Sequence, residues 1–145
     1  MIDFNQFEKK ADLVFKDKTL LKQAFMHRSY LNENKNSGLA HNERLEFLGD
    51  AVLELVATDF LFKRYPEKNE GELTSYRAAL VNTQSLSKAS TELGVNDYLL
   101  LSKGEAKDTG RARLIILADA MEAIIGAIYL DRGYLSAKTF IEKNI

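Results

Sequence analysis

The stretch HNERLEFLGDAVL, residues 41–53, decides how this chain folds, because acidic and apolar residues recur in it with the period of a helix. Glu43, Glu46 and Asp50 are three and four residues apart. A helix that turns about 100° per residue therefore places these carboxylates on one stripe. The opposite stripe is apolar and is expected to face the core; it consists of Leu45, Leu48, Val52 and Leu55.

A second segment also sets carboxylates in an apolar background. In LADAMEAIIGAIYL, residues 117–130, Asp119 and Glu122 lie three residues apart on a predicted helix that is apolar almost all round. Gly126 and the neighbouring alanines would let another helix approach closely. Burying one unpaired carboxylate costs several kcal/mol, and crowding several together costs more. The sequence therefore predicts two facing acidic helices with something cationic between them.

These segments resemble the ribonuclease III family, the divalent-metal endonucleases that cut double-stranded RNA. NEGELTSYRAALVN at 69–82 and ILADAMEAIIGAIYLDRGY at 116–134 follow the first stretch in the order of the bacterial members, and the HRS of 27–29 and the GE of 104–105 also agree. The resemblance covers essentially the whole chain. At Ile115 the family usually has a small polar residue, a departure that concerns a hydrogen bond behind the carboxylates and not the carboxylates themselves.

The resemblance implies a role for each of four acids. Glu46, Asp119 and Glu122 match the family's metal ligands, and Asp50 and Glu122 match the residues most closely tied to catalysis. The implied ion is Mg²⁺, with Mn²⁺ as a substitute, since hard divalent ions choose oxygen ligands and assist phosphodiester hydrolysis. The implied activity is endonucleolytic hydrolysis of double-stranded RNA to 5′-phosphate ends and short 3′ overhangs, in ribosomal and messenger RNA processing.

The position of Phe47 indicates a partner chain. It lies about 40° from Glu43 on the helical wheel, near the acidic stripe, so that a monomer would expose it. Family members are homodimers with this helix at the interface, and we expect Phe47 to be buried against a second copy. The alternative is that Phe47 belongs to the ordinary core. A two-fold dimer would place two sites across one groove, one for each strand of a duplex recognised by its shape.

Three further residues have open roles. Glu43 lies in a first helical turn, where the helix dipole favours a carboxylate whatever its function. Glu70 matches an acidic family position but falls in a predicted loop. His27 is interpreted as a hydrogen-bonded structural residue or a contact to the RNA backbone. Neither His27 nor His41 joins the catalytic set, because Mg²⁺ rarely chooses imidazole.

Composition is that of one globular domain. The 145 residues are 46% hydrophobic and 28% charged, without cysteine, which fits a reducing cytoplasm. The charged N-terminus is neither a signal peptide nor a membrane span. A net charge of −1 argues against an ordinary nucleic-acid binder, unless a metal neutralises the acids and leaves the surface basic.

Helical periodicity dominates throughout, and the predicted fold is all-α with a single domain, residues 1–145. We expect helices over 4–15, 18–27, 43–65 with Asn42 as N-cap, 72–93 with Gly94 as C-cap, 115–130, and from 135 onward. Predicted loops are 32–40, 67–71 and a mobile basic loop over 103–113. No stretch resembles the double-stranded-RNA-binding domain that usually follows in bacterial members, so the chain is expected to be the catalytic domain alone.

Two other function classes are alternatives to a double-stranded-RNA endonuclease. The first is a relative that keeps the fold but acts as an inactive RNA-binding or structural protein; retention of all four acids argues against it. The second is a ferritin-like carboxylate bundle, which typically needs Glu-x-x-His pairs. Neither histidine follows a glutamate by three residues.

Overall fold

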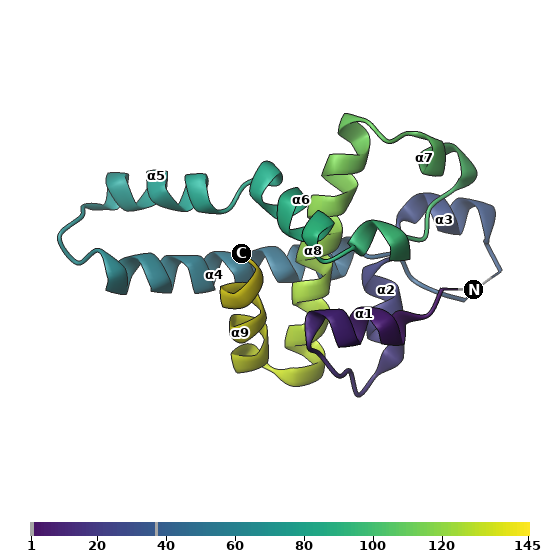
Figure 1. Ribbon diagram of the computed structural model, residues 1–145, viewed down its shortest axis with the longest axis horizontal. Helices are drawn as coiled ribbons and strands as arrows, with labels where there is room; N and C mark the ends of the chain where they lie inside the picture. The colour runs from purple at the N-terminus through teal and green to yellow at the C-terminus, as the bar shows by residue number, and fades with distance from the viewer. Residues whose placement is uncertain (1, 37) are drawn as a thin grey trace.

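The computed structural model describes residues 2–36 and 38–145, and every regular element in that part of the chain is helical (Figure 1). An isolated bridge between Met26 and Leu100 is the one β-type contact among these residues. The all-α prediction is confirmed. The helices are α1 (Phe4–Ala11), α2 (Lys18–Ala24), α3 (Arg28–Glu33), α4 (Glu43–Arg64), α5 (Glu70–Leu80), α6 (Thr83–Glu92), α7 (Lys103–Lys107), α8 (Arg111–Arg132) and α9 (Tyr134–Asn144), with a 3₁₀ turn at Val95–Tyr98.

Helix α8 lies at the centre of the molecule and crosses α4, with α6, α2 and α9 packed around it (Figure 1). Met121, Ile124, Ile125 and Ile128 are fully buried, as expected for a helix that is apolar all round. Helix α8 starts at Arg111, before the predicted start at 115. The two acidic residues that were predicted on this helix, Asp119 and Glu122, lie within its buried stretch.

The crossing of α4 and α8 is built on two glycines. A Cβ atom on Gly49 would lie 1.7 Å from the backbone oxygen of Glu122, and one on Gly126 would lie 2.2 Å from that of Leu45. The helix backbones therefore touch, as expected for Gly126.

The buried stripe of α4 follows these contacts and differs from the predicted one. Leu45 and Val52 are buried as predicted, but Leu55 is 55% exposed and Leu48 only half-buried. Leu53 is fully buried instead. Because Gly49 faces α8, the core stripe is rotated toward the acidic one, and the carboxylates border the core.

The second half of α4 and the antiparallel α5 extend from the body as an arm (Figure 1). The predicted single helix over 72–93 is wrong, because Val81 is extended (φ −122°, ψ 99°) and separates α5 from α6. The Asn82 side chain stabilises the break: it accepts from the Ser85 N–H and donates to the oxygens of Ala78 and Ala79. Gly94, at φ 73°, follows the end of α6 as predicted.

Each of the three predicted loops contains helical residues. Residues 103–113 include α7 and the start of α8, held together by the buried Arg113, which is 8% exposed. Helix α3 begins directly after His27 and ends at Glu33, so its last two residues fall in the predicted loop over 32–40. Asn42 is the N-cap residue of α4 as predicted, but its side chain donates to the Ala24 oxygen and makes no capping hydrogen bond.

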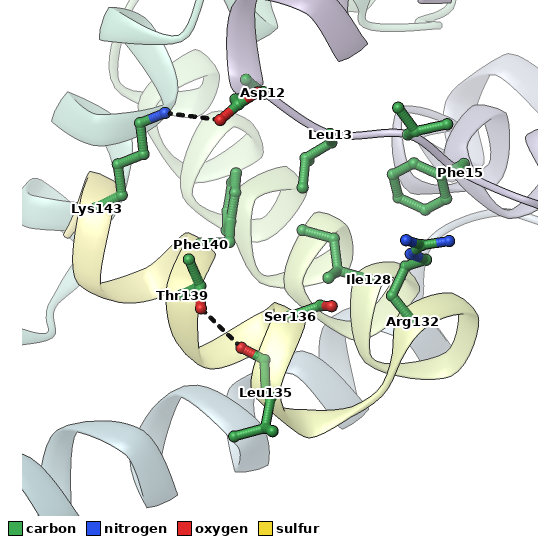
Figure 2. A pocket seen from close by; sticks show the side chains of 12 residues that line it. Asp12, Leu13, Phe15, Ile128, Arg132, Leu135, Ser136, Thr139, Phe140 and Lys143 are labelled. Carbon is green, nitrogen blue, oxygen red and sulfur yellow. Dashed lines mark hydrogen bonds and ion pairs between the residues drawn. The ribbon is translucent and has the colours of Figure 1, made fainter.

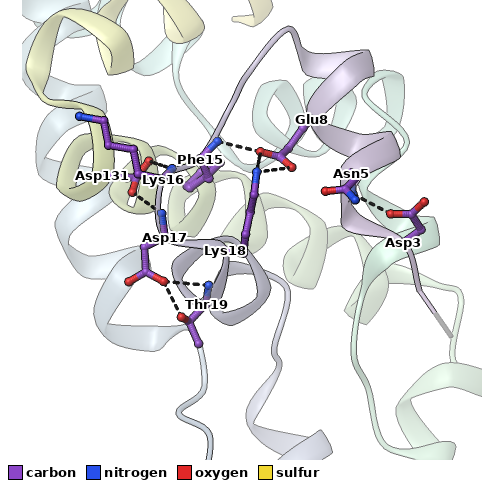
Figure 3. A network of polar contacts seen from close by, with 9 residues as sticks. All are labelled: Asp3, Asn5, Glu8, Phe15, Lys16, Asp17, Lys18, Thr19 and Asp131. Carbon is purple, nitrogen blue, oxygen red and sulfur yellow. Dashed lines mark hydrogen bonds and ion pairs between the residues drawn. The ribbon is translucent and has the colours of Figure 1, made fainter.

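The N-terminal segment is fastened to the end of α8 (Figure 3). The Asp131 carboxylate accepts from the backbone N–H groups of Lys16 and Asp17 at 2.8 and 2.9 Å. The predicted first helix ends at Ala11 and not at residue 15, because Asp12 adopts the left-handed conformation. Among the described residues, no helix has the length and apolar character needed to cross a membrane.

Candidate metal centre

An acidic cavity of about 730 Å³ opens between the N-terminal halves of α4 and α8. Helix α4 contributes Glu43, Glu46 and Asp50, and α8 contributes Asp119 and Glu122. The remaining wall consists of His27, Arg28, Asn42, Phe47, Ile115 and Ile116. The two acidic helices of the sequence analysis thus face each other across one cavity.

Three carboxylates meet inside it. Glu46, Asp119 and Glu122 each offer one oxygen atom, and these atoms all lie within 4.8 Å of one another. All three side chains are half-buried. These are the residues for which metal ligation is predicted, and the fold brings them together from two helices.

The carboxyl groups are arranged in two pairs across the helix crossing. Glu46 shares a hydrogen bond with Asp119, and Glu122 shares one with Asp50. Burial, the hydrogen bond with Asp50 and the neighbouring negative charges raise the pKa of Glu122 to about 9. Burial and the charge of Asp119 raise the pKa of Glu46 to about 7. Burial also raises the pKa of Asp119.

This donor set fits a hard divalent cation. Among residues 2–36 and 38–145, no lysine, arginine or histidine forms an ion pair with Glu46, Asp119 or Glu122. The ionised carboxylates would therefore repel one another unless a cation lies between them. Oxygen ligands from carboxylates are those that Mg²⁺ and Mn²⁺ prefer.

The other acidic candidates lie outside the cluster of three carboxylates. Asp50 is exposed and lines the cavity beside Glu122, outside the three-carboxylate cluster. Glu43 is also exposed and lies 3.7 Å from the Arg28 guanidinium. Glu70 begins α5 on the arm, not in a loop, and does not line the cavity.

The two histidines make similar local contacts. The Nδ1 atom of His27 accepts from the Ser29 N–H, and that of His41 from the Glu43 N–H. His27 lines the cavity, whereas His41 does not. Ile115, the departure from the family pattern, lies on the cavity wall, where its side chain provides no hydrogen bond.

Phe47 is 83% exposed, so the alternative that it belongs to the core is wrong for this chain. Two contributions were not predicted from the sequence: that of Arg28 to the cavity wall and that of Gly49 to the helix crossing. Gly49 was detectable, because a glycine within a strongly helical pattern costs stability unless something requires close approach.

A second cavity, of about 300 Å³, lies between residues 11–15, the end of α8 and α9 (Figure 2). Phe15, Ile128 and Phe140 line its apolar side. Its one carboxylate, Asp12, is paired with Lys143 at 3.6 Å. It lacks the clustered acids that distinguish the first cavity.

Comparisons with known proteins agree on one family. The family model described as Ribonuclease-III-like matches residues 17–145. A protein named ribonuclease 3 from Chloroflexus aggregans is 49% identical over 139 residues, which cover 94% of this chain and 61% of that protein. This chain thus spans about three fifths of the length of that relative.

Solved structures give the same result. The nuclease domain of ribonuclease III from Campylobacter jejuni is 44% identical with a TM-score of 0.88, and the match covers 99% of each chain. That structure is described as flexible in a region involved in dimer formation. Dicer from Pichia stipitis is 33% identical with a TM-score of 0.64, over 88% of this chain and 53% of the other.

Proposed function

Because this chain belongs to the ribonuclease III family, we propose that it is a divalent-metal-dependent endonuclease that hydrolyses double-stranded RNA. The observation that carries the proposal is the convergence of Glu46, Asp119 and Glu122 within 4.8 Å in an open acidic cavity. The match to a nuclease domain over 99% of both chains supports the assignment of residues 1–145 to the catalytic domain.

In the proposed mechanism, Glu46, Asp119 and Glu122 hold Mg²⁺ or Mn²⁺. Such an ion, when bound, helps to deprotonate a water and stabilises negative charge on the leaving oxygen. Glu122 must lose its proton to act as a ligand, and Asp50 shares the hydrogen bond that this proton makes. Deprotonation of Glu122 breaks that hydrogen bond and leaves Asp50, which also lines the cavity, free to accept a proton from a water near the scissile phosphate.

The proposed active form is a homodimer. Phe47 and four other side chains are among the apolar residues on α4 and α8 that are between 47% and 83% exposed, which is costly unless another surface covers them. A two-fold partner would cover the same patch on both copies and pair two acidic cavities. These side chains are Phe47, Leu55, Phe62, Leu114 and Ile115.

The remaining parts of the proposal come from the family. One cut in each strand by paired sites would leave 5′-phosphate ends and short 3′ overhangs. The proposed setting is processing of ribosomal and messenger RNA in the cytoplasm. A ferritin-like iron site receives no support, since the three meeting ligands include no histidine.

Cleavage of a long, perfectly paired RNA at low salt tests the function. We expect cutting with Mg²⁺, none with EDTA, and none by Glu122→Gln, which keeps the size of the side chain but removes a negative ligand. Glu142→Gln, on the exposed surface of α9, is the matched control and should cut normally. A folded wild-type dimer that binds duplex RNA without cutting it would instead support the inactive RNA-binding relative.

A further inference from the structure

His27 is held in one orientation by its contacts with Ser29 and with the segment at residues 100–102. Its backbone N–H donates to the Leu100 oxygen at 3.0 Å, next to the bridge between Met26 and Leu100. Its Nδ1 atom lies 3.2 Å from the Ser29 nitrogen and 2.7 Å from the Ser29 Oγ. The Ser29 Oγ in turn accepts from the Ser102 N–H at 3.0 Å. The imidazole therefore has little freedom to rotate.

These contacts fix the position of the imidazole proton. A backbone N–H only donates, so the Ser29 N–H requires an unprotonated lone pair on Nδ1. In the neutral ring the proton then resides on Nε2. Burial lowers the pKa of His27, which favours this neutral form. His27 thus presents an Nε2–H donor.

In the described part of the chain, that donor has no partner on the cavity wall, whereas the other side chains there that carry N–H groups each have one. Three side chains that line the acidic cavity carry N–H groups: His27, Arg28 and Asn42. The Arg28 guanidinium pairs with Glu43, and the Asn42 amide donates to the Ala24 oxygen and is 4% exposed. Among the described residues, the His27 Nε2 atom makes no hydrogen bond.

We propose that His27 contacts the substrate: its Nε2–H donates a hydrogen bond to a backbone phosphate oxygen of the RNA strand in the acidic cavity. This inference rests on the proposed function and adds a substrate-binding residue to it. An anionic oxygen is the matching acceptor, since hydrogen bonds to charged groups are stronger than those between neutral groups. A neutral donor also suits a site whose carboxylates must remain available to a cation.

Two substitutions separate substrate contact from a structural role. Asparagine is a favourable N-cap whose Oδ1 accepts the Ser29 N–H, so His27→Asn keeps the start of α3 but removes the distal donor. Glutamine reaches farther and restores an N–H near the Nε2 position. His41→Asn is the matched control, because the Nδ1 of His41 also accepts a backbone N–H but lies outside the cavity.

We expect His27→Asn to lower kcat/KM for duplex RNA at least tenfold without changing the thermal midpoint, and His27→Gln to recover part of the loss. His41→Asn should cut like wild type. The slope of log affinity against log salt should be unchanged in His27→Asn, because a neutral donor releases no counterion. Equal kcat/KM for His27→Asn and wild type would overturn the proposal.

NMR separates this proposal from the proposed function. Long-range ¹H–¹⁵N spectra of the free protein should show His27 protonated on Nε2, and duplex RNA added with Ca²⁺ should shift that nitrogen more than either His41 nitrogen. Protonation on Nδ1, or no shift in a formed complex, would overturn the contact whether or not the chain cuts. If the wild-type protein does not cut duplex RNA, the proposed function fails. In that case the RNA contact is judged from binding alone, and it is rejected if His27→Asn binds duplex RNA as tightly as wild type does.

Discussion

Gly49 and Gly126 face each other where α4 crosses α8, and neither position has room for a Cβ atom. The nearest obstacles are backbone oxygens, at 1.7 Å from a Cβ on Gly49 and 2.2 Å from one on Gly126. Backbone cannot move aside as a flexible side chain does. The spacing of the carboxylates therefore depends on the absence of two side chains.

Gly49→Ala should push the helices apart and lower the free energy of unfolding by about 3 kcal/mol or more, because the clash lies in the core. Urea unfolding followed by circular dichroism measures the loss. Gly71→Ala is the control: it lies in α5, where a Cβ would meet only the Asn69 side chain at 3.4 Å. Alanine there should be neutral or stabilising by up to about 1 kcal/mol. Equal stability of Gly49→Ala and wild type would contradict the close crossing.

Stability without metal should fall as pH rises. Glu122 has a folded pKa of about 9, above the ordinary value of 4.5 that applies in the unfolded chain. Below pH 4.5 the group is protonated in both states and contributes nothing. Between these values the unfolded state ionises while the folded state keeps its proton, so stability is lost until about pH 9. Glu46, with a pKa of about 7, adds to the loss below pH 7.

Thermal midpoints in EDTA at pH 5, 7 and 9 test this dependence. Glu122→Gln does not titrate, so it should be more stable than wild type, by a margin that widens with pH. Stabilisation of wild type by Mg²⁺ should also grow with pH, because the ion binds the ionised carboxylates. A margin that narrows from pH 5 to pH 9 would contradict the raised pKa.

Phe47→Asp should weaken the dimer and leave the fold intact. The side chain is 83% exposed, so its loss removes no core contact, whereas a charge in an interface resists desolvation. Sedimentation should show dissociation at concentrations where wild type remains dimeric, with an unchanged helical circular dichroism spectrum. Val14→Asp changes another exposed apolar residue, 69% exposed and outside α4 and α8, and should leave association unchanged. Equal dissociation of both variants would argue against Phe47 at the interface.

The sequence carried enough information for the helix class and the acidic cavity, because these depend on periodicity within α4 and α8. The sequence did not predict features that depend on contacts between helices. Leu55 fits an apolar stripe but is exposed, since the contact of Gly49 with α8 determines which face of α4 is buried. The break at Val81 was not predicted, because residues 75–85 (SYRAALVNTQS) contain neither proline nor glycine. The one local signal is Asn82, which can cap a helix and caps α6.

Arg113 illustrates the same limit. It falls in the predicted mobile basic loop over 103–113, yet its side chain is buried. The guanidinium donates to Asn96 Oδ1 at 2.7 Å and to the backbone oxygens of Glu105 and Ala106 at 3.0 and 3.2 Å. Local periodicity does not reveal such partners, because they come from the turn before Leu99 and from α7.

Arg113→Met should loosen α7 and destabilise the fold by about 2–4 kcal/mol. Methionine fills much of the buried volume but leaves two carbonyl oxygens and the Asn96 amide without their donor. Hydrogen exchange should speed up in residues 103–107 more than in α4, since only the former depend on the guanidinium. Arg111→Met, an exposed neighbour on the same helix, should change neither stability nor exchange. If exchange in α7 were the same in both variants, the guanidinium would not be what holds that helix.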